Sequence, residues 1–292
     1  MVALVPLSVS ALDYKMVPGA GGAPLNVMEA GDKTKPSILL IHGFAQSHLS
    51  FAKQLESPEL TRDYHLVAMD LRGHGNSAKP WRPEDYKDSK IWADDVIAVM
   101  EATGLQKPVI VGWSYGGFIV ANVIEHYGTA RMAGINLVGS AGGLLETNFA
   151  PPANAEIAKQ MAANRARQVS GNIAENMTGA KGAMGFLTAK PGDQAWQDLA
   201  YAGNLLLLPY VRTALAGRSL DNTKVLPKIN VPTLITRGSV DSVITQEQAE
   251  KLVKAIPGAT QSIYEGVGHS PFYEAPGRFN RELAAFAKSV AK

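Results

Sequence analysis

The chain has 292 residues, of which 46% are hydrophobic and 18% charged, proportions typical of a globular protein with a large buried core. Its formal net charge is only +2 and it contains no run of five basic residues, so neither nucleic acid nor a membrane surface is expected as a partner. It has no cysteine, which excludes disulfides, thiolate metal sites and a cysteine nucleophile.

The amino-terminal residues 1–6 lack the basic region and the sustained apolar run of a secretory signal peptide. No apolar run in the chain approaches the ~20 residues that a membrane-spanning helix needs. We therefore expect a soluble, cytoplasmic protein. The sequence leaves its oligomeric state open.

Eight short apolar segments, bounded by Gly, Pro or Asp, predict the strands of one sheet. They are 12–17, 25–29, 37–42, 66–70, 109–112, 135–138, 233–236 and 261–264. The first two are expected to form an antiparallel hairpin around the Gly-rich turn 18–22. Helical patterns follow over 89–103, over 115–126 and from Thr245, which with Gln248 has the spacing of a capping box. Strands that alternate with helices predict a mostly parallel sheet with helices on both faces.

The alternation stops between residues 144 and 222. This segment is rich in Ala, Asn, Met and Leu, includes Pro151 and Pro152, and shows no strand pattern. We interpret it as a helical cap over the carboxyl edge of the sheet, where open α/β sheets bind ligands. The predicted organisation is a core domain formed by residues 1–143 and 223–292, interrupted by the cap.

The segment from Gly112 through Ser114 to Gly116 has the pattern of a nucleophile elbow. Such an elbow holds a serine on a strained turn between a strand and a helix, and the flanking glycines remove side chains that would clash. The pattern alone is weak, because it is expected by chance in roughly one chain in ten of this length. Here a buried-strand run, 108–111, precedes it and an apolar helix, 118–124, follows. This context favours an elbow over a Gly-rich tight turn.

At these positions the sequence resembles the α/β-hydrolase superfamily, and the resemblance covers essentially the whole chain. Residues 38–44 (ILLIHGF) resemble the strand and His-Gly loop that precede the oxyanion hole, and residues 68–77 (AMDLRGHGNS) resemble the family's Arg-Gly turn. Residues 44–51 are most similar to the haloperoxidase-like esterases and enol-lactonases. The resemblance implies an α/β-hydrolase fold, with a mostly parallel eight-stranded sheet flanked by helices and a helical cap insertion.

The resemblance also implies a base and an acid for Ser114. A serine hydroxyl needs a base within hydrogen-bond reach to act as a nucleophile. Among the six histidines, His269 lies in a Gly-rich loop after the last predicted strand, which resembles the family's C-terminal histidine loop. Asp241 follows the next-to-last strand and completes the chain order Ser, Asp, His of this fold. Glu146, after the preceding strand, is the alternative acid.

The remaining polar candidates surround this triad. By resemblance, the backbone N–H groups of Phe44 and Tyr115 form the oxyanion hole, which needs two donors aimed at the developing negative charge. His42 is expected to brace the His-Gly loop. Asp70 and Arg72 are interpreted as an internal ion pair that holds their turn, rather than as catalytic groups.

Four aromatic residues are candidates to line the substrate pocket, with helix packing as the alternative interpretation of those in the cap. They are Trp113, beside the nucleophile, and Phe149, Phe186 and Trp196 in the cap. The sequence has no glycine signature for dinucleotides or phosphates and no cluster with metal-ligand spacing. We therefore expect neither a cofactor nor a metal.

These features predict a serine hydrolase that cleaves a small-to-medium carboxylic ester or lactone through an acyl-enzyme on Ser114. Perhydrolysis, C–C bond hydrolysis and hydroxynitrile cleavage remain alternatives, because function depends on the site rather than on the fold. A ligand receptor with slow or single turnover is the alternative of a different class. The turnover number distinguishes a receptor from an enzyme.

Overall fold

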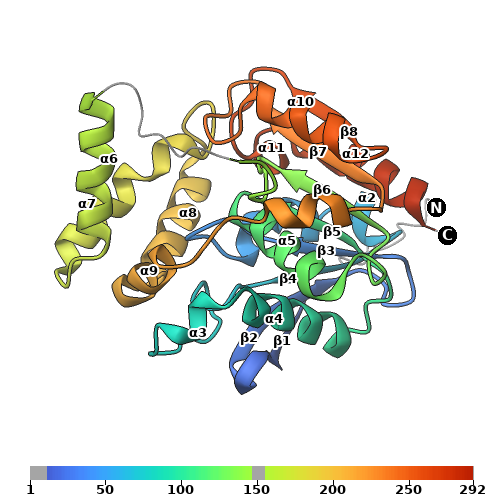
Figure 1. The fold of residues 1–292 in the computed structure, drawn as a ribbon, viewed down its shortest axis with the longest axis horizontal. Helices are drawn as coiled ribbons and strands as arrows, with labels where there is room; N and C mark the ends of the chain where they lie inside the picture. The colour runs from blue at the N-terminus through green and yellow to red at the C-terminus, as the bar shows by residue number, and fades with distance from the viewer. Residues whose placement is uncertain (1–11, 147–154, 292) are drawn as a thin grey trace, which may run out of the picture.

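The computed structural model describes residues 12–146 and 155–291, and its centre is one eight-stranded sheet (Figure 1). The strand order is β1-β2-β4-β3-β5-β6-β7-β8. The strands are β1 Asp13–Pro18, β2 Pro24–Ala30, β3 Ser37–Ile41, β4 His65–Met69, β5 Val109–Trp113, β6 Gly134–Val138, β7 Thr233–Gly238 and β8 Thr260–Tyr264. Strand β2 is antiparallel to β1 and β4, and every pair from β4 to β8 is parallel. The predicted mostly parallel sheet is confirmed.

Helices cover both faces of this sheet because its central strands are apolar on both sides. In β3, Leu39 and Ile41 pack into one core, while Ile38 and Leu40 pack into the other. The first core is covered by α4 (Ser89–Ala102), α5 (Tyr115–Tyr127) and α10 (Gln246–Ala255). The second is covered by the short helices α1 (Ala52–Leu55), α2 (Pro58–Thr61) and α11 (Pro271–Glu274) and by the long α12 (Pro276–Val290). The short α3 (Glu84–Lys87) precedes α4.

Side-chain hydrogen bonds at the N-cap residue explain where two of the helices begin. Thr245 caps α10, and both hydrogen bonds of the predicted capping box with Gln248 are present. Asp88 caps α4 by accepting a hydrogen bond from the N–H of Lys90. No helix within the described residues is both long and apolar enough to cross a membrane.

The described part of the predicted insertion is helical. It contains α6 Ala155–Gln168, α7 Ile173–Gly182, η3 Met184–Phe186, α8 Gln194–Leu206 and α9 Pro209–Ala216, and no strand within 155–222. Figure 1 shows α6 and α7 standing farthest from the sheet, with α8 between them and the core. At the neck, the N–H of Asn222 donates to the carbonyl of Gly143 at 2.9 Å. This contact joins the two ends of the insertion, although the exact division into domains stays a prediction.

Candidate active site

Ser114 occupies a strained turn between β5 and α5. Its φ of 52° and ψ of −115° lie in a region that non-glycine residues rarely adopt, at a cost of about 1–3 kcal/mol. Glycine is required on both sides of the turn. A Cβ on Gly112 would lie 2.8 Å from the carbonyl oxygen of Gly116, and a Cβ on Gly116 would collide with the carbonyl of Ile41. The elbow geometry predicted from the sequence is therefore present, and it raises the serine above the carboxyl end of β5.

His269 and Asp241 form a buried pair at the same edge of the sheet. The Nδ1 atom of His269 lies 3.1 Å and 3.0 Å from the two carboxylate oxygens of Asp241, and both side chains are fully buried. The backbone N–H of Val243 donates to the same carboxylate at 2.7 Å. The structure thus brings Asp241 to the histidine, whereas the alternative acid Glu146 is exposed to solvent.

The pairing decides which nitrogen of His269 can act as a base. An ionised carboxylate only accepts hydrogen bonds, so Nδ1 carries the proton and Nε2 keeps its lone pair. Nε2 is buried and has no hydrogen-bond partner among the described residues. The indole N–H of Trp113 donates to the backbone carbonyl of His269 at 2.9 Å, which ties the histidine loop to the elbow. His269 is thus held beside the elbow with Nε2 available.

The His-Gly loop lies against the nucleophile. A Cβ added to Gly43 would be 3.1 Å from the Cβ of Ser114. His42 holds this loop, because its Nδ1–H donates to the carbonyl of Gly43 at 2.7 Å and its Nε2 accepts from the N–H of Leu71 at 3.0 Å. Burial lowers the pKa of His42 to about 4, so the ring is neutral and keeps this pattern at physiological pH. The predicted bracing role of His42 is confirmed.

Of the two candidate oxyanion donors, Tyr115 directly follows Ser114, and Phe44 follows Gly43 in the loop that lies against the serine. Tyr115 is the first residue of α5, where a backbone N–H has no partner within the helix. The N–H of Phe44, which follows Gly43, makes no backbone hydrogen bond to the described residues. Two N–H groups are therefore available near the serine, and their oxyanion role stays a prediction.

The aromatic residues proposed to line the substrate pocket lie in different environments. Phe186 is 45% exposed, and its ring centroid lies 5.9 Å from that of His269, so it borders the site. Trp196 is buried and stacks on Tyr273 at 4.0 Å between centroids, at the junction of cap and core. Phe149 lies outside the described residues. The expectation for Trp113 is wrong, because it is fully buried and its ring packs edge-on to Phe51 and Phe272 in the core.

The expected ion pair between Asp70 and Arg72 is also wrong. Arg72 instead pairs with Asp95 of α4, with Nη2 at 2.7 Å and Nε at 2.9 Å from the carboxylate oxygens. The Asp70 carboxylate accepts hydrogen bonds from the backbone N–H and Nδ1–H of His48 at 2.7 and 2.8 Å. Both acids are buried, so both pairs are structural. The turn is held to two other elements by these pairs, and the N–H of Asn76 also donates to the Asp70 carboxylate within the turn at 2.8 Å.

Glu274 is a residue that the sequence analysis missed. Its two carboxylate oxygens accept hydrogen bonds from the N–H of Gly268, at 2.9 Å, and from the N–H of Ala189 in the cap, at 2.8 Å. Burial raises the pKa of this carboxyl, against the opposing effect of the backbone hydrogen bonds. Glu274 thereby links the residue before His269 to the cap. Its position five residues after the histidine is the only signal in the sequence.

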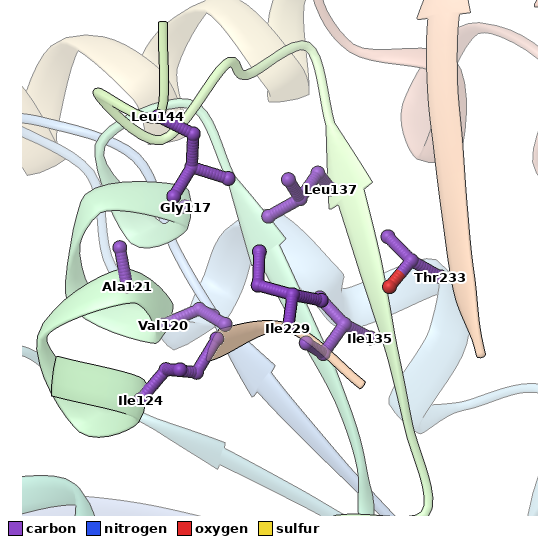
Figure 2. Close-up of a pocket in the computed structure, with 9 residues that line it drawn as sticks. All are labelled: Gly117, Val120, Ala121, Ile124, Ile135, Leu137, Leu144, Ile229 and Thr233. Atoms are coloured by element: carbon purple, nitrogen blue, oxygen red, sulfur yellow. The ribbon is translucent and has the colours of Figure 1, made fainter. Parts of the chain in front are cut away.

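A narrow apolar space in the core lies apart from the candidate triad. Figure 2 shows a narrow cavity between α5, β6 and the start of β7, far less polar than an active site. Its lining residues are Gly117, Val120, Ala121, Ile124, Ile135, Leu137, Leu144, Ile229 and Thr233. Thr233 supplies the only polar side chain of this lining, and the space is too small to admit a water molecule, so it offers no room for a ligand. Within the described ranges, no group of three or more His, Asp and Glu side chains could hold a metal ion.

The geometry agrees with comparisons to known proteins. The family model described as the alpha/beta hydrolase fold matches residues 36–276. A non-heme chloroperoxidase from Streptomyces lividans is 30% identical over 243 residues, covering 79% of this chain and 84% of that protein. A bifunctional esterase/perhydrolase from Acinetobacter calcoaceticus is 28% identical over 281 residues, covering 92% of this chain and 97% of that protein. The solved structure of a candidate aryl esterase from Burkholderia cenocepacia has 30% sequence identity and a TM-score of 0.85, and the match covers 95% of this chain and 99% of that one.

Proposed function

The chain belongs to the α/β-hydrolase family, in its haloperoxidase-like esterase branch, and we propose that it is a serine esterase that cleaves small-to-medium carboxylic esters or lactones. The observation that carries this proposal is the buried His269–Asp241 pair, which leaves Nε2 of His269 without a hydrogen-bond partner among the described residues. Trp113, next to the strained Ser114, ties the histidine loop to the elbow. The esterase names of the relatives support the same reaction class.

In the proposed mechanism, Ser114 Oγ attacks the ester carbonyl while His269 Nε2 accepts its proton. Asp241 holds the ring in the required tautomer and stabilises the imidazolium that forms. The carbonyl oxygen becomes an oxyanion, which the N–H groups of Phe44 and Tyr115 stabilise. His269 then gives its proton to the leaving alcohol, and an acyl-enzyme remains. Water repeats the sequence, releases the acid and restores the serine.

Steady-state hydrolysis of para-nitrophenyl esters of rising acyl length tests this proposal. We expect wild type to turn over a good ester at about 1 s⁻¹ or faster, the low end of the usual enzyme range. Ser114→Ala should retain less than roughly a thousandth of the wild-type kcat, because loss of a triad nucleophile typically costs more than that. Ser289→Ala, at an exposed serine of α12, is the matched control and should behave as wild type.

The same experiment separates the enzyme from a receptor. An organophosphate should label Ser114 in both cases, so labelling alone decides nothing. A receptor would show a burst stoichiometric with protein and no measurable second cycle across short and medium acyl esters. That result would exclude the esterase proposal.

Perhydrolysis is the second candidate reaction, and the relatives named perhydrolase and non-heme chloroperoxidase favour it. The same acyl-enzyme would be attacked by hydrogen peroxide instead of water, which releases a peroxy acid. We expect any peroxy acid formed from acetate and peroxide to depend on Ser114. Formation at the same rate by Ser114→Ala would exclude a common acyl-enzyme.

A further inference from the structure

A second cavity lies within the cap, between α7 and the corner where α8 meets α9. Its volume is about 210 Å³, enough for a short carbon chain with a polar end group. Its walls combine apolar side chains with three amides and one guanidinium. The lining residues are Gln168, Gly171, Ile173, Asn176, Ala180, Asn204, Leu205, Leu207, Leu208, Pro209 and Arg212. Ile173 and Leu208 are partly exposed to solvent, so the cavity has an opening.

Arg212 is the only ionisable side chain in this lining, and it is 7% exposed. All its hydrogen bonds go to neutral oxygens. Its Nε donates to the carbonyl of Leu207, its Nη2 to the carbonyl and side-chain oxygens of Asn204, and its Nη1 to Gln168 at 3.3 Å. A guanidinium has five N–H groups, so one N–H on Nη1 remains for a ligand.

No carboxylate of the described residues forms an ion pair with Arg212. Residues 1–11 and 147–154 contain no Asp or Glu, so they cannot supply a side-chain counter-charge either. Burial lowers the pKa of Arg212 to about 10, which still leaves it protonated at neutral pH. Arg212 is therefore a buried cation without a carboxylate partner among the residues that the structure describes.

Arg212 belongs to α9, and the contact of its guanidinium with the end of α8 offsets only part of its charge. Its guanidinium binds the last carbonyls of that helix, whose dipole is equivalent to roughly half a negative charge. The helix dipole therefore offsets only part of the positive charge, and an unpaired charge is costly when it is buried. An anion in the cavity would balance it. Because the other walls are amides and apolar side chains, a carboxylate on a short carbon chain matches them.

Arg212 also contacts the edge of the candidate active site. The carbon at the centre of its guanidinium lies 5.6 Å from the centroid of the Phe44 ring. Phe44 follows Gly43, which lies against Ser114. One residue thus borders both the cap cavity and the loop beside the nucleophile.

From this arrangement we propose that the cap cavity binds the free carboxylate of an ester substrate through Arg212. This inference rests on the proposed esterase function and names its substrate class, monoesters of short dicarboxylic acids. Ser114 attacks the ester carbonyl at one end of the substrate while Arg212 holds the acid at the other. The carboxylate itself takes no part in bond breaking.

The test compares an anionic ester with its neutral analogue. Para-nitrophenyl monoesters of succinic, glutaric and adipic acids are assayed beside the corresponding monoamides, and the ratio of kcat/KM, acid over amide, is the readout. We expect this ratio to exceed one for at least one chain length. Arg212→Gln should lower it roughly ten-fold or more, the effect of losing one charge-assisted hydrogen bond. Arg212→Lys should retain part of the preference, since it keeps the charge.

Arg165→Gln is the matched control, because it removes one positive charge from the same cap at an exposed position on α6. It should leave the ratio unchanged. An equal fall in Arg165→Gln and Arg212→Gln would mean that general electrostatics, not a subsite, sets the preference. A ratio near one at every length in wild type would overturn the proposal.

Titration of wild type with free glutarate by calorimetry gives a readout that does not depend on turnover. We expect binding that Arg212→Gln loses and competitive inhibition against the anionic ester. Inhibition or activation that is not competitive would identify a separate effector site and overturn the substrate assignment. If no ester is hydrolysed at all, the proposed function fails while glutarate binding still reports on the cavity. If neutral esters are hydrolysed and glutarate does not bind, only the carboxylate subsite fails.

Discussion

Gly139 offers a direct test of whether the His269–Asp241 pair drives turnover. It follows β6 with φ of 55°, and a Cβ added there would lie 2.8 Å from His269 Nδ1 and 3.0 Å from Asp241 Oδ2. Non-bonded heavy atoms prefer separations of about 3.5–4.0 Å, so Gly139→Ala must push the pair apart by roughly 0.5–1 Å. Both side chains are fully buried in a close-packed region, so neither can move away without disturbing its neighbours.

The expected loss follows from these distances. A hydrogen bond of 3.0 Å that lengthens beyond about 3.5 Å is no longer effective, and His269 then loses control of its tautomer and orientation. Misplacement of a catalytic group by about 1 Å typically costs on the order of a hundred-fold in rate. The positive φ adds roughly 1–2 kcal/mol of strain for alanine, and crowding adds about 1–3 kcal/mol. We expect kcat to fall about a hundred-fold and stability to fall by about 2–5 kcal/mol.

Gly104→Ala separates backbone strain from the effect on the pair. Gly104 has φ of 70°, and a Cβ there would meet no atom within 4 Å. This control should lose only the strain energy and keep wild-type kcat. The assay is kcat at saturating para-nitrophenyl acetate, with active sites counted by organophosphate titration and folding checked by thermal melting. If folded Gly139→Ala keeps kcat within about three-fold of Gly104→Ala, the pair does not act in the limiting step as proposed.

Three further predictions concern the acids around the site. Asp241→Asn should lower kcat by orders of magnitude, whereas Glu146→Gln should be nearly silent; the opposite pattern would reassign the acid. Burial would raise the pKa of Asp70, but hydrogen bonds from His48 hold it below its usual range. Its charge therefore adds stability that is complete above about pH 4 and lost as pH falls further. Asp70→Asn should be less stable by about 1.5–3 kcal/mol at pH 7, the usual value of a hydrogen bond to a charged group, and its stability should decline less as the pH is lowered. Glu274→Gln loses one of two acceptor oxygens, so we expect the free energy of unfolding, measured by thermal melting, to fall by about 1–2 kcal/mol and kcat to decrease. Wild-type stability and wild-type kcat in this variant would show that Glu274 does not link the histidine loop to the cap.

Local signals in the sequence predict the fold class and the order of the candidate triad. Apolar runs bounded by turn residues are local signals, and all eight predicted strands are present in one sheet. The glycines around Ser114 are equally local, because the elbow needs their missing side chains at fixed positions in the chain. By resemblance, the sequence indicates Asp241 as the acid and leaves Glu146 as the alternative, and the structure places Asp241 against His269.

Contacts between side chains that are distant in the chain could not be read from local patterns, because they depend on how the elements pack. Arg72 and Asp95 are far apart in sequence, and nothing in the turn itself indicates that its arginine pairs with a helix rather than with Asp70. Its place beside the nucleophile suggests that Trp113 faces the pocket. Side chains alternate along β5, however, and Trp113 points with Val109 and Val111 into the core under α11 and α12. The sequence likewise does not predict that Arg212 lacks a carboxylate partner among the described residues. The unpaired charge arises because packing α7 against the α8–α9 corner buries most of a cation without bringing a carboxylate to it.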